Sequence, residues 1–266
     1  MENLIKGARI AYGIMVIGLA IQQLVYAEFR PVIFPPWPDA GILPAVFTYA
    51  GSFAVVLVGL AILFERNARK LSLVLGVVLL FVLVFCQIPY ELVMGFYKHL
   101  GSWSSAIKEM AICGGAFVVA DSFPITAEGP QKKLNATNIS QRLAPLGRIL
   151  FGLMLALFGA DHFLYPDFCV SLIPAWIPWA GFWVYFAGVA LVASGVSIIM
   201  GIKKSLIGTL TALMMFLWLI TLHIPRAIID PYTGKGNELS SVFESLGFSG
   251  IALLTAWSDV LKKYDQ

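Results

Sequence analysis

The strongest constraint on this chain is an internal repeat. Aligned without gaps, residues 9–38 and 148–177 share eight identities in thirty positions. The tripeptide at 87–89 (Gln-Ile-Pro) also recurs at 223–225 as His-Ile-Pro. The matched residues include Arg9/Arg148, Gly13/Gly152, Tyr26/Tyr165, Phe29/Phe168, Pro35/Pro174, Trp37/Trp176, Ser104/Ser240 and Gly114/Gly250. Such a duplication predicts that the chain builds one structural unit twice.

Composition assigns this unit to a lipid bilayer. The 266 residues are 59% hydrophobic and 12% charged, whereas a soluble domain has about 25% charged residues. A membrane-spanning helix needs about 20 mostly apolar residues. Eight runs meet this need, at roughly 10–27, 45–64, 71–90, 105–123, 149–165, 182–200, 205–224 and 241–258. We therefore predict an all-α, polytopic integral membrane protein with eight transmembrane helices in two four-helix repeats.

The distribution of basic residues predicts the orientation of the repeats. We place the first unit at 1–125, a polar linker at 126–147 and the second unit at 148–266. Lys and Arg gather at alternate helix ends, which by the positive-inside rule face the cytoplasm together with both termini. Because each unit has four helices, the two repeats run in the same sense. We expect a bacterial inner (plasma) membrane location, and the basic pI needs no nucleic-acid partner.

Ionisable side chains within the spans concentrate in the second unit. Asp161 and His162 fall late in the fifth run, and His223 ends the seventh. Arg226 follows directly, and Glu244 lies near the start of the eighth run. A charged group inside a membrane is costly unless it is paired or hydrated, so these residues are candidates for function.

The first unit has mainly amides and a tyrosine at the aligned positions, with Glu91 as the exception. These residues are Gln22, Gln23, Gln87 and Tyr90. At about 1.5 Å per residue, the depths of His162 and His223 differ by less than about 10 Å, so the two could share an outer-facing cavity. We predict that the second unit carries the site and that the first supports it.

Each candidate also has a structural alternative. The two histidines could be hydrogen-bonded packing groups. Arg226 could simply hold Asp161, Asp230 or Glu244, because a guanidinium beside a carboxylate lowers the cost of burying both. Lys108 and Glu109 are expected to form an interfacial pair. The three cysteines show no Cys-x-x-Cys spacing, so they are expected to pack as small apolar groups.

Two segments rich in Pro and Trp follow the first helix of each unit, at 34–38 and 173–179. Pro ends a helix and Trp prefers the headgroup level, so each segment is expected to form a corner capping the outer side of its unit. The alternative is an aromatic rim, including Trp176, that admits a flat or lipid-like molecule.

The stretch 159–168 (GADHFLYPDF), followed by 173–178 (IPAWIP), resembles the DoxX-like membrane family. The segment 223–226 (HIPR) is similar to that family's third-helix ending. The resemblance implies two fused DoxX-like units and singles out His162, His223 and Arg226. Relatives in the family include subunits linked to thiosulfate and quinone oxidation and proteins needed to mature a periplasmic amine dehydrogenase. The first unit departs from the pattern, with Gln23 in place of His162 and Tyr90 in place of Arg226.

Two hypotheses for function remain open. In the first, the second unit binds a quinone or similar small molecule, with His162 or His223 passing a proton, Arg226 stabilising negative charge and Asp161 setting the imidazole tautomer. A redox partner subunit would then supply electrons. In the second, the protein is a non-catalytic component that binds a lipid or hydrophobic ligand or stabilises a partner protein. Glu244 and Trp176 are further ligand-binding candidates. We expect neither haem nor a metal ion, because no ligand spacing for either is recognisable.

Overall fold

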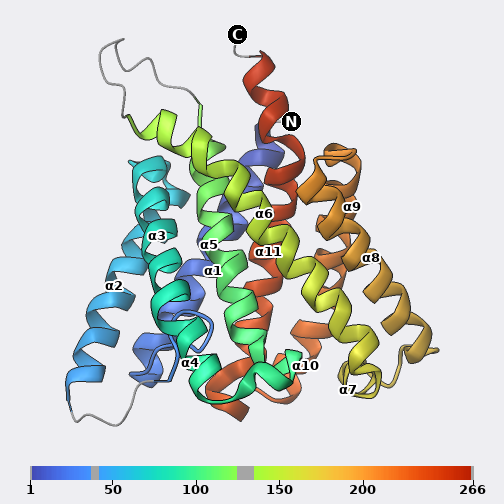
Figure 1. Ribbon diagram of the computed structural model, residues 1–266. Helices are drawn as coiled ribbons and strands as arrows, with labels where there is room; N and C mark the ends of the chain where they lie inside the picture. Colours follow the sequence, from blue (N-terminus) through green and yellow to red (C-terminus); the bar gives the residue numbers. More distant parts are fainter. Residues whose placement is uncertain (1, 37–41, 125–134, 265–266) are drawn as a thin grey trace.

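The computed structural model describes residues 2–36, 42–124 and 135–264, with side chains described as far as residue 257. All regular structure in these ranges is helical (Figure 1). The long helices are α1 (Glu2–Tyr26), α2 (Leu43–Leu63), α3 (Ala68–Val82), α5 (Ser104–Asp121), α6 (Ala136–Leu164), α8 (Ala180–Met200), α9 (Lys204–Trp218) and α11 (Thr233–Tyr264). The short ones are α4 (Ile88–Val93), α7 (Pro166–Leu172) and α10 (Ile224–Ile229), with 3-10 turns η2 (Phe96–Lys98) and η3 (Leu100–Trp103).

Seven helical segments in the described part of the chain are long and apolar enough to cross a membrane. They are Glu2–Tyr26, Leu43–Leu63, Ala68–Val93, Ala136–Leu164, Ala180–Met200, Lys204–Ile229 and Thr233–Trp257. The predicted all-helical membrane class is therefore confirmed. The fourth predicted span corresponds to α5, which has 18 residues but carries Lys108, Glu109 and Asp121. An eighth spanning helix stays a prediction.

The helices pack in the same order in both halves of the chain. In the first half α1 packs on α2, α2 on α3 and α3 on α5, and in the second half α6 packs on α8, α8 on α9 and α9 on α11. Between the halves, α1 lies along α11 and α5 along α6. We call these two contacts the α1–α11 seam and the α5–α6 seam. The first and last helices of each half therefore pack against the other half as well as against their own.

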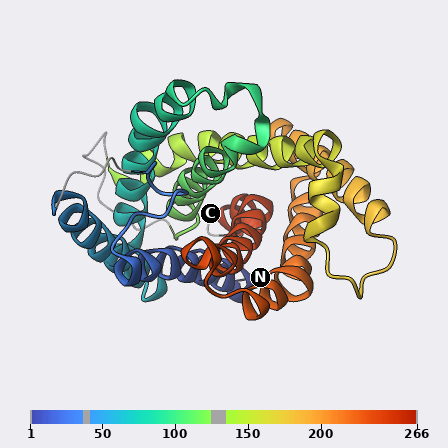
Figure 2. The ribbon, with the colours of Figure 1, turned by 90° about the horizontal axis from the view of Figure 1, so that it is seen from below.

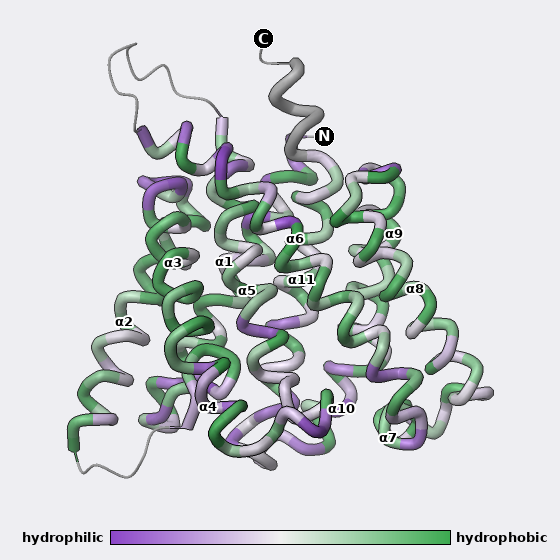
Figure 3. Tube along the Cα trace, in the orientation of Figure 1, coloured by the Kyte–Doolittle hydropathy of each residue, from purple (hydrophilic) through white to green (hydrophobic). Residues whose placement is uncertain are grey.

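The helices α5 and α11 form the interior of the bundle. Seen from below in Figure 2, both lie inside the ring made by the other long helices. Most of α5 is buried, while α2 and α9 expose much of their apolar surface. Figure 3 shows hydrophilic segments at the two ends of the bundle and also inside it, near α5 and α11. The central helices carry the buried acids Glu109 of α5 and Glu244 of α11.

Small residues bring the helices of both seams into close contact. A Cβ atom added at Gly114 of α5 would lie 2.5 Å from the Gly147 carbonyl oxygen of α6. At the aligned Gly250 of α11, a Cβ atom would lie 2.5 Å from the Ala8 carbonyl oxygen of α1. Backbone contact of this kind at small residues is the usual means of tight helix packing in membranes. The two seams therefore use aligned residues for their closest approach.

The third long helix of each half ends in a π-helical turn. These turns are η1 (Leu83–Gln87) and η4 (Leu219–His223). Each is followed by a six-residue helix, α4 or α10, whose first two residues are Ile-Pro. Proline has no backbone N–H, so it suits the first turn of a helix, which would leave that donor unused. The aligned residues Gln87 and His223 consequently occupy the same place, the last position of a π turn, where functional side chains are often found.

The predicted linker and Pro-rich corners lie partly outside the described residues. Of the linker at 126–147, positions 126–134 are not described, while the rest leads into α6, which already begins at Ala136. The Asn135 side chain caps this helix by accepting a hydrogen bond from the Asn138 backbone N–H, a 2.8 Å contact that satisfies an otherwise free donor. The polar residues at 135–147, which predicted a linker, therefore form the N-cap and the first turns of α6. Trp37 and Pro38 of the first corner also lie outside the described residues.

Candidate functional site

The predicted site residues lie at the end of the bundle that holds α7 and α10, opposite the two chain termini (Figure 1). His162 lies in the last turn of α6, half-buried, with its Cβ atom close to Gly188 of α8. Its Nδ1–H donates to the Phe158 carbonyl oxygen at 2.7 Å, and its ring is stacked with Trp218 of α9 at a centroid distance of 6.5 Å. A carbonyl can only accept, so the neutral imidazole keeps Nε2 as its acceptor.

At His162 the Phe158 carbonyl oxygen, and not Asp161, bonds Nδ1 and sets the tautomer of the ring. A role of Asp161 towards His223 stays a prediction. Consecutive residues on a helix point in different directions, so Asp161 faces another neighbour. Asp161 is buried, its Oδ1 atom has no hydrogen-bond partner among the described residues, and it lies within electrostatic range of His99 and Cys169.

His99 belongs to this site, although the sequence did not single it out. It precedes η3 in the first half, and its ring stacks on Tyr165 of the second half at a centroid distance of 4.2 Å. The Leu100 backbone N–H donates to the Tyr165 hydroxyl at 3.0 Å. Burial raises the pKa of the nearby Cys169 thiol, and the Asp161 carboxylate raises it further. The end of the α5–α6 seam opposite the chain termini thus combines an acid, an imidazole, a phenol and a thiol from both halves.

The Arg226 side chain forms its ion pair with Glu238 of α11. Its Nε and Nη2 atoms donate to the two carboxylate oxygens at 2.9 and 2.6 Å, and Nη1 donates to the Leu172 carbonyl oxygen at 3.2 Å. A bidentate pair of this kind is both strong and directional. The expected structural partners of Arg226 were Asp161, Asp230 or Glu244. Of these, Asp230 lies within electrostatic range of Arg226, while Glu244 pairs with Lys108.

His223 lies among the charges of this region. Lys108, Glu238 and Arg226 are all within electrostatic range of its ring, and its Nδ1 atom is buried without a hydrogen-bond partner among the described residues. His162 and His223 therefore have different surroundings: the first lies against Trp218, and the second lies among ion pairs.

Glu244 forms an ion pair with Lys108 across the centre of the bundle, at an Nζ to Oε2 distance of 2.7 Å. The predicted Lys108–Glu109 pair is therefore wrong. The same spacing that aligns Ser104 with Ser240 aligns Lys108 with Glu244, and two helical turns further on it aligns Gly115 with Ile251. A Cβ atom added at Gly115 would collide with the Ile251 side chain. Aligned residues of α5 and α11 thus meet each other, which the repeat spacing could have revealed from the sequence.

The α1–α11 seam carries a second polar group at its end opposite the chain termini. The Gln22 amide donates to the Gly236 carbonyl oxygen at 2.9 Å and accepts from the Ser240 hydroxyl at 2.9 Å. Arg30 lies beside it, with Nη1 donating to the Lys235 carbonyl oxygen at 2.8 Å. Burial lowers the pKa of Arg30, while the nearby Glu244, Tyr26 and Glu28 act in the opposite direction. Both ends of the Gln22 amide are thus bonded to α11, while the Arg30 Nε atom is buried without a hydrogen-bond partner among the described residues.

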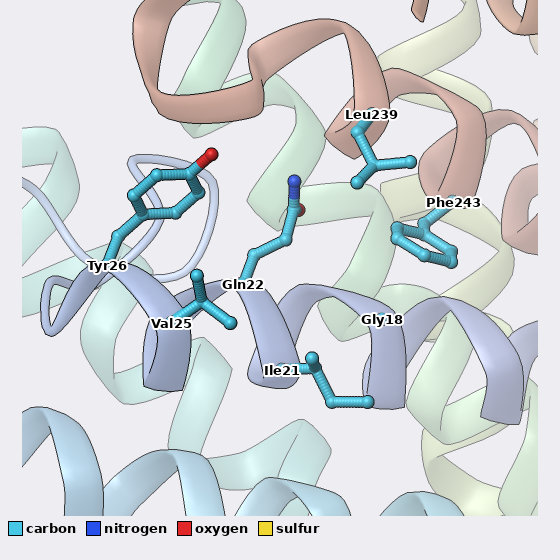
Figure 4. A pocket seen from close by; sticks show the side chains of 7 residues that line it. All are labelled: Gly18, Ile21, Gln22, Val25, Tyr26, Leu239 and Phe243. Atoms are coloured by element: carbon cyan, nitrogen blue, oxygen red, sulfur yellow. The ribbon is translucent and has the colours of Figure 1, made fainter. Parts of the chain in front are cut away.

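An apolar groove of about 180 Å³ runs along the α1–α11 seam. Figure 4 shows its walls, with the Tyr26 hydroxyl towards one end, the Phe243 ring at the other and the Gln22 amide between them. The lining residues are Gly18, Ile21, Gln22, Val25, Tyr26, Leu239 and Phe243. Gly18 matters here because a Cβ atom would lie 2.5 Å from the Phe243 ring. The groove was not anticipated, since its polar residues belong to the half expected to be supportive.

The remaining candidates lie apart from this groove. Trp176 follows α7, is 65% exposed and does not line the groove. Within the described part of the chain, no group of three or more His, Cys, Asp or Glu side chains is arranged to hold a metal ion.

Comparison with known proteins gives one family match. A family model described as a domain of unknown function (DUF8561) matches residues 151–239. This stretch includes Asp161, His162, His223, Arg226 and Glu238. No curated protein and no solved structure matches the chain.

Proposed function

We propose that this chain is an integral membrane protein with eight spanning helices, built from two parallel four-helix units of the DoxX-like type. The support comes from the seven apolar helices together with α5, from the matching order of packing, and from the π turns at aligned positions. The basic residues at alternate helix ends favour cytoplasmic termini in a bacterial inner membrane. The groove and the Arg226–Glu238 pair would then face the outer side.

The function that the geometry supports best is binding of a lipid-soluble molecule with a polar head, such as a lipid or a quinone. The observation that carries this proposal is the groove in the α1–α11 seam. Its rim residues Ile21 and Val25 are 49% and 71% exposed, so the groove opens towards the surrounding lipid. Small-molecule sites typically combine apolar walls with a few polar groups that fix orientation.

The polar end of the groove can bind an acceptor oxygen. One N–H of the Gln22 amide is used by Gly236, which leaves a second N–H because a primary amide has two. The Tyr26 hydroxyl also lines the groove. These two donors suit a quinone carbonyl, an ester or a phosphate oxygen, while the volume matches a ring or the first part of an acyl chain rather than a whole lipid.

Filling the groove tests the proposal. Ile21→Trp is expected to displace the ligand, because the indole would occupy the space between α1 and α11. Native mass spectrometry of the protein released from nanodiscs, with extraction of bound lipids and quinones, measures the loss. Val77→Trp is the matched control, since Val77 is 53% exposed on α3, outside the groove. Equal ligand content in wild type, variant and control would reject the groove as the site.

The second candidate is a redox-linked protein that turns over a quinone with a partner subunit. The observation in its favour is the buried Nδ1 atom of His223, which has no partner among the described residues and lies beside Arg226. A ring nitrogen of this kind can bond a quinone carbonyl or relay a proton.

Quinone reduction in reconstituted membranes tests this candidate with His162→Ala, His223→Ala and Arg226→Ala. Val93→Ala, at an 85% exposed position, is the control. The redox candidate requires at least His223→Ala to lose activity. It fails if all three variants keep full turnover or if wild type shows none with any donor.

A further inference from the structure

Arg30, which follows α1, is a buried cation without an ion pair among the described residues. It is only 5% exposed. Its Nη1 atom donates to the Lys235 carbonyl oxygen at 2.8 Å, whereas Nε is buried and has no acceptor within the described ranges. A buried charge that lacks a partner is costly. Neither proposed function uses Arg30, so its charge is so far unexplained.

The acids around Arg30 already have other partners. Glu244 and Glu28 lie within its electrostatic range. Glu244 is paired with Lys108 at 2.7 Å, and Glu28 is paired with Lys235. The charged residues that these contacts connect are thus three cations and two carboxylates. One positive charge is left over, and it belongs to Arg30.

Arg30 lies beside the polar residues of the groove. Tyr26, which lines the groove, is within electrostatic range of Arg30. Arg30 and Gln22 bond the carbonyl oxygens of neighbouring residues, Lys235 and Gly236. A Cβ atom added at Gly236 would lie 3.2 Å from both the Gln22 amide nitrogen and the Tyr26 hydroxyl oxygen. The guanidinium, the amide and the hydroxyl therefore lie around one short backbone segment, and Figure 4 shows the last two in the groove.

The aligned positions of the second half carry no such positive charge. Arg30 aligns with Cys169, and Gln22 aligns with Asp161. Asp161 and Cys169 lie within electrostatic range of each other. The end of the α5–α6 seam therefore has an acid and a thiol where the α1–α11 seam has an amide and a guanidinium. A cation at this place is not required by the repeated helix packing, and it belongs specifically to the seam that contains the groove.

The chemistry of these three side chains favours an anion with several oxygens. A guanidinium has five N–H donors and no acceptor. The Gln22 amide keeps one N–H beyond its bond to Gly236, and the Tyr26 hydroxyl can also donate. Arginine suits phosphate particularly well, because its planar group matches the spacing of the phosphate oxygens. A neutral quinone carbonyl would leave the charge of Arg30 uncompensated.

We propose that the groove binds an anionic phospholipid of the surrounding membrane. Arg30 neutralises the phosphate, and the Gln22 amide and Tyr26 hydroxyl donate hydrogen bonds to its oxygens. The first part of an acyl chain lies against Ile21 and Phe243. This inference rests on the proposed binding function, because it names the class of molecule that occupies the groove.

Native mass spectrometry of the protein released from nanodiscs tests the head group. The nanodiscs contain equal amounts of phosphatidylglycerol and phosphatidylcholine, and the lipid that Ile21→Trp loses identifies the groove lipid. Wild type is expected to hold phosphatidylglycerol there. Arg30→Gln should lower this preference about fivefold, the typical effect of one cation on an anionic lipid, and Arg30→Lys should largely keep it.

The matched control is Lys98→Gln, which removes one positive charge at an exposed position of η2 outside the groove. It should leave the preference unchanged. If Arg30→Gln does not fold, Tyr26→Phe decides instead, because it removes one donor to the phosphate and must also lower the preference.

The outcomes separate this inference from the proposed binding function. If Ile21→Trp displaces a neutral lipid or a quinone, the groove stays a binding site and the anionic head group is rejected. The same holds if Arg30→Gln is folded and keeps the preference of wild type, or if Lys98→Gln loses it equally. If Ile21→Trp displaces no molecule at all, both the groove and the anionic head group are rejected.

Discussion

The two seams between the halves have the same helix geometry but different chemistry. At the α1–α11 seam, Gln22 bonds to Gly236 and Ser240 and closes the end of an apolar groove. At the α5–α6 seam, the aligned Asp161 keeps one oxygen without a partner among the described residues and lies near His99. The polar chemistry is therefore divided between seams to which both halves contribute, rather than between an active and a supportive half.

The substitutions with the largest expected effect disrupt the close helix contact that the two seams share. Gly114→Leu and Gly250→Leu should both abolish the folded protein, because each new side chain would run into backbone of the neighbouring helix. Folded yield after detergent extraction measures the loss. Gly7→Leu is the control, since nothing lies within 4 Å of a Cβ atom there. A loss at only one of the two positions would contradict the equivalence of the seams.

Removing one partner of the central ion pair should have the next largest effect. Lys108→Met leaves the buried Glu244 carboxylate unpaired, which typically costs about 3–5 kcal/mol of stability. The double variant Lys108→Met with Glu244→Met should recover most of this loss, because no charge is then stranded. Thermal unfolding in nanodiscs checks both. If the double variant is as unstable as Lys108→Met, the loss comes from packing and not from charge.

The outer corner offers a smaller contrast between the halves. Arg226→Ala removes charged hydrogen bonds to Glu238 and should cost about 1.5–3 kcal/mol. Tyr90→Ala, at the aligned position of the first half, removes a ring whose only described ring contact is edge-on with Phe96, so it should cost less. Comparing unfolding temperatures of the two variants checks this. A larger loss of stability in Tyr90→Ala than in Arg226→Ala would contradict this order.

The smallest effect concerns the reactivity of Cys169. The Asp161 carboxylate raises the pKa of this thiol, so Asp161→Asn should lower that pKa and increase the thiolate fraction at neutral pH. The rate of alkylation by a maleimide, measured at the Cys169 peptide, should therefore rise modestly. Cys86 serves as the internal reference, because its own acidic neighbour is Glu109. An unchanged ratio of the two alkylation rates would show that Asp161 does not affect the Cys169 thiol.

The sequence predicted the all-helical membrane class and most of the helices, because a run of about 20 apolar residues can do little else than form a membrane-spanning helix. It also located His162, His223 and Arg226 at one end of the bundle. It missed Glu238 as the partner of Arg226, Lys108 as the partner of Glu244 and His99 as a neighbour of Asp161, because these contacts join different segments and depend on how the helices pack. The alignment of Lys108 with Glu244 is visible in the sequence. The complete burial of Glu109 could not be predicted from the sequence, because polar and small residues lie on both sides of it in α5.

The contact between α1 and α11 bears on the order in which the protein folds during synthesis. Helix α1 is synthesised before α11, which is one of its two main packing partners. Native contacts between distant parts of a chain form late and slow the completion of folding. Until α11 is made, the face of α1 that includes Gln22 lacks its partners Gly236 and Ser240. The polar contacts of α1 are thus completed only by α11, and a chain stalled before α11 would leave them open.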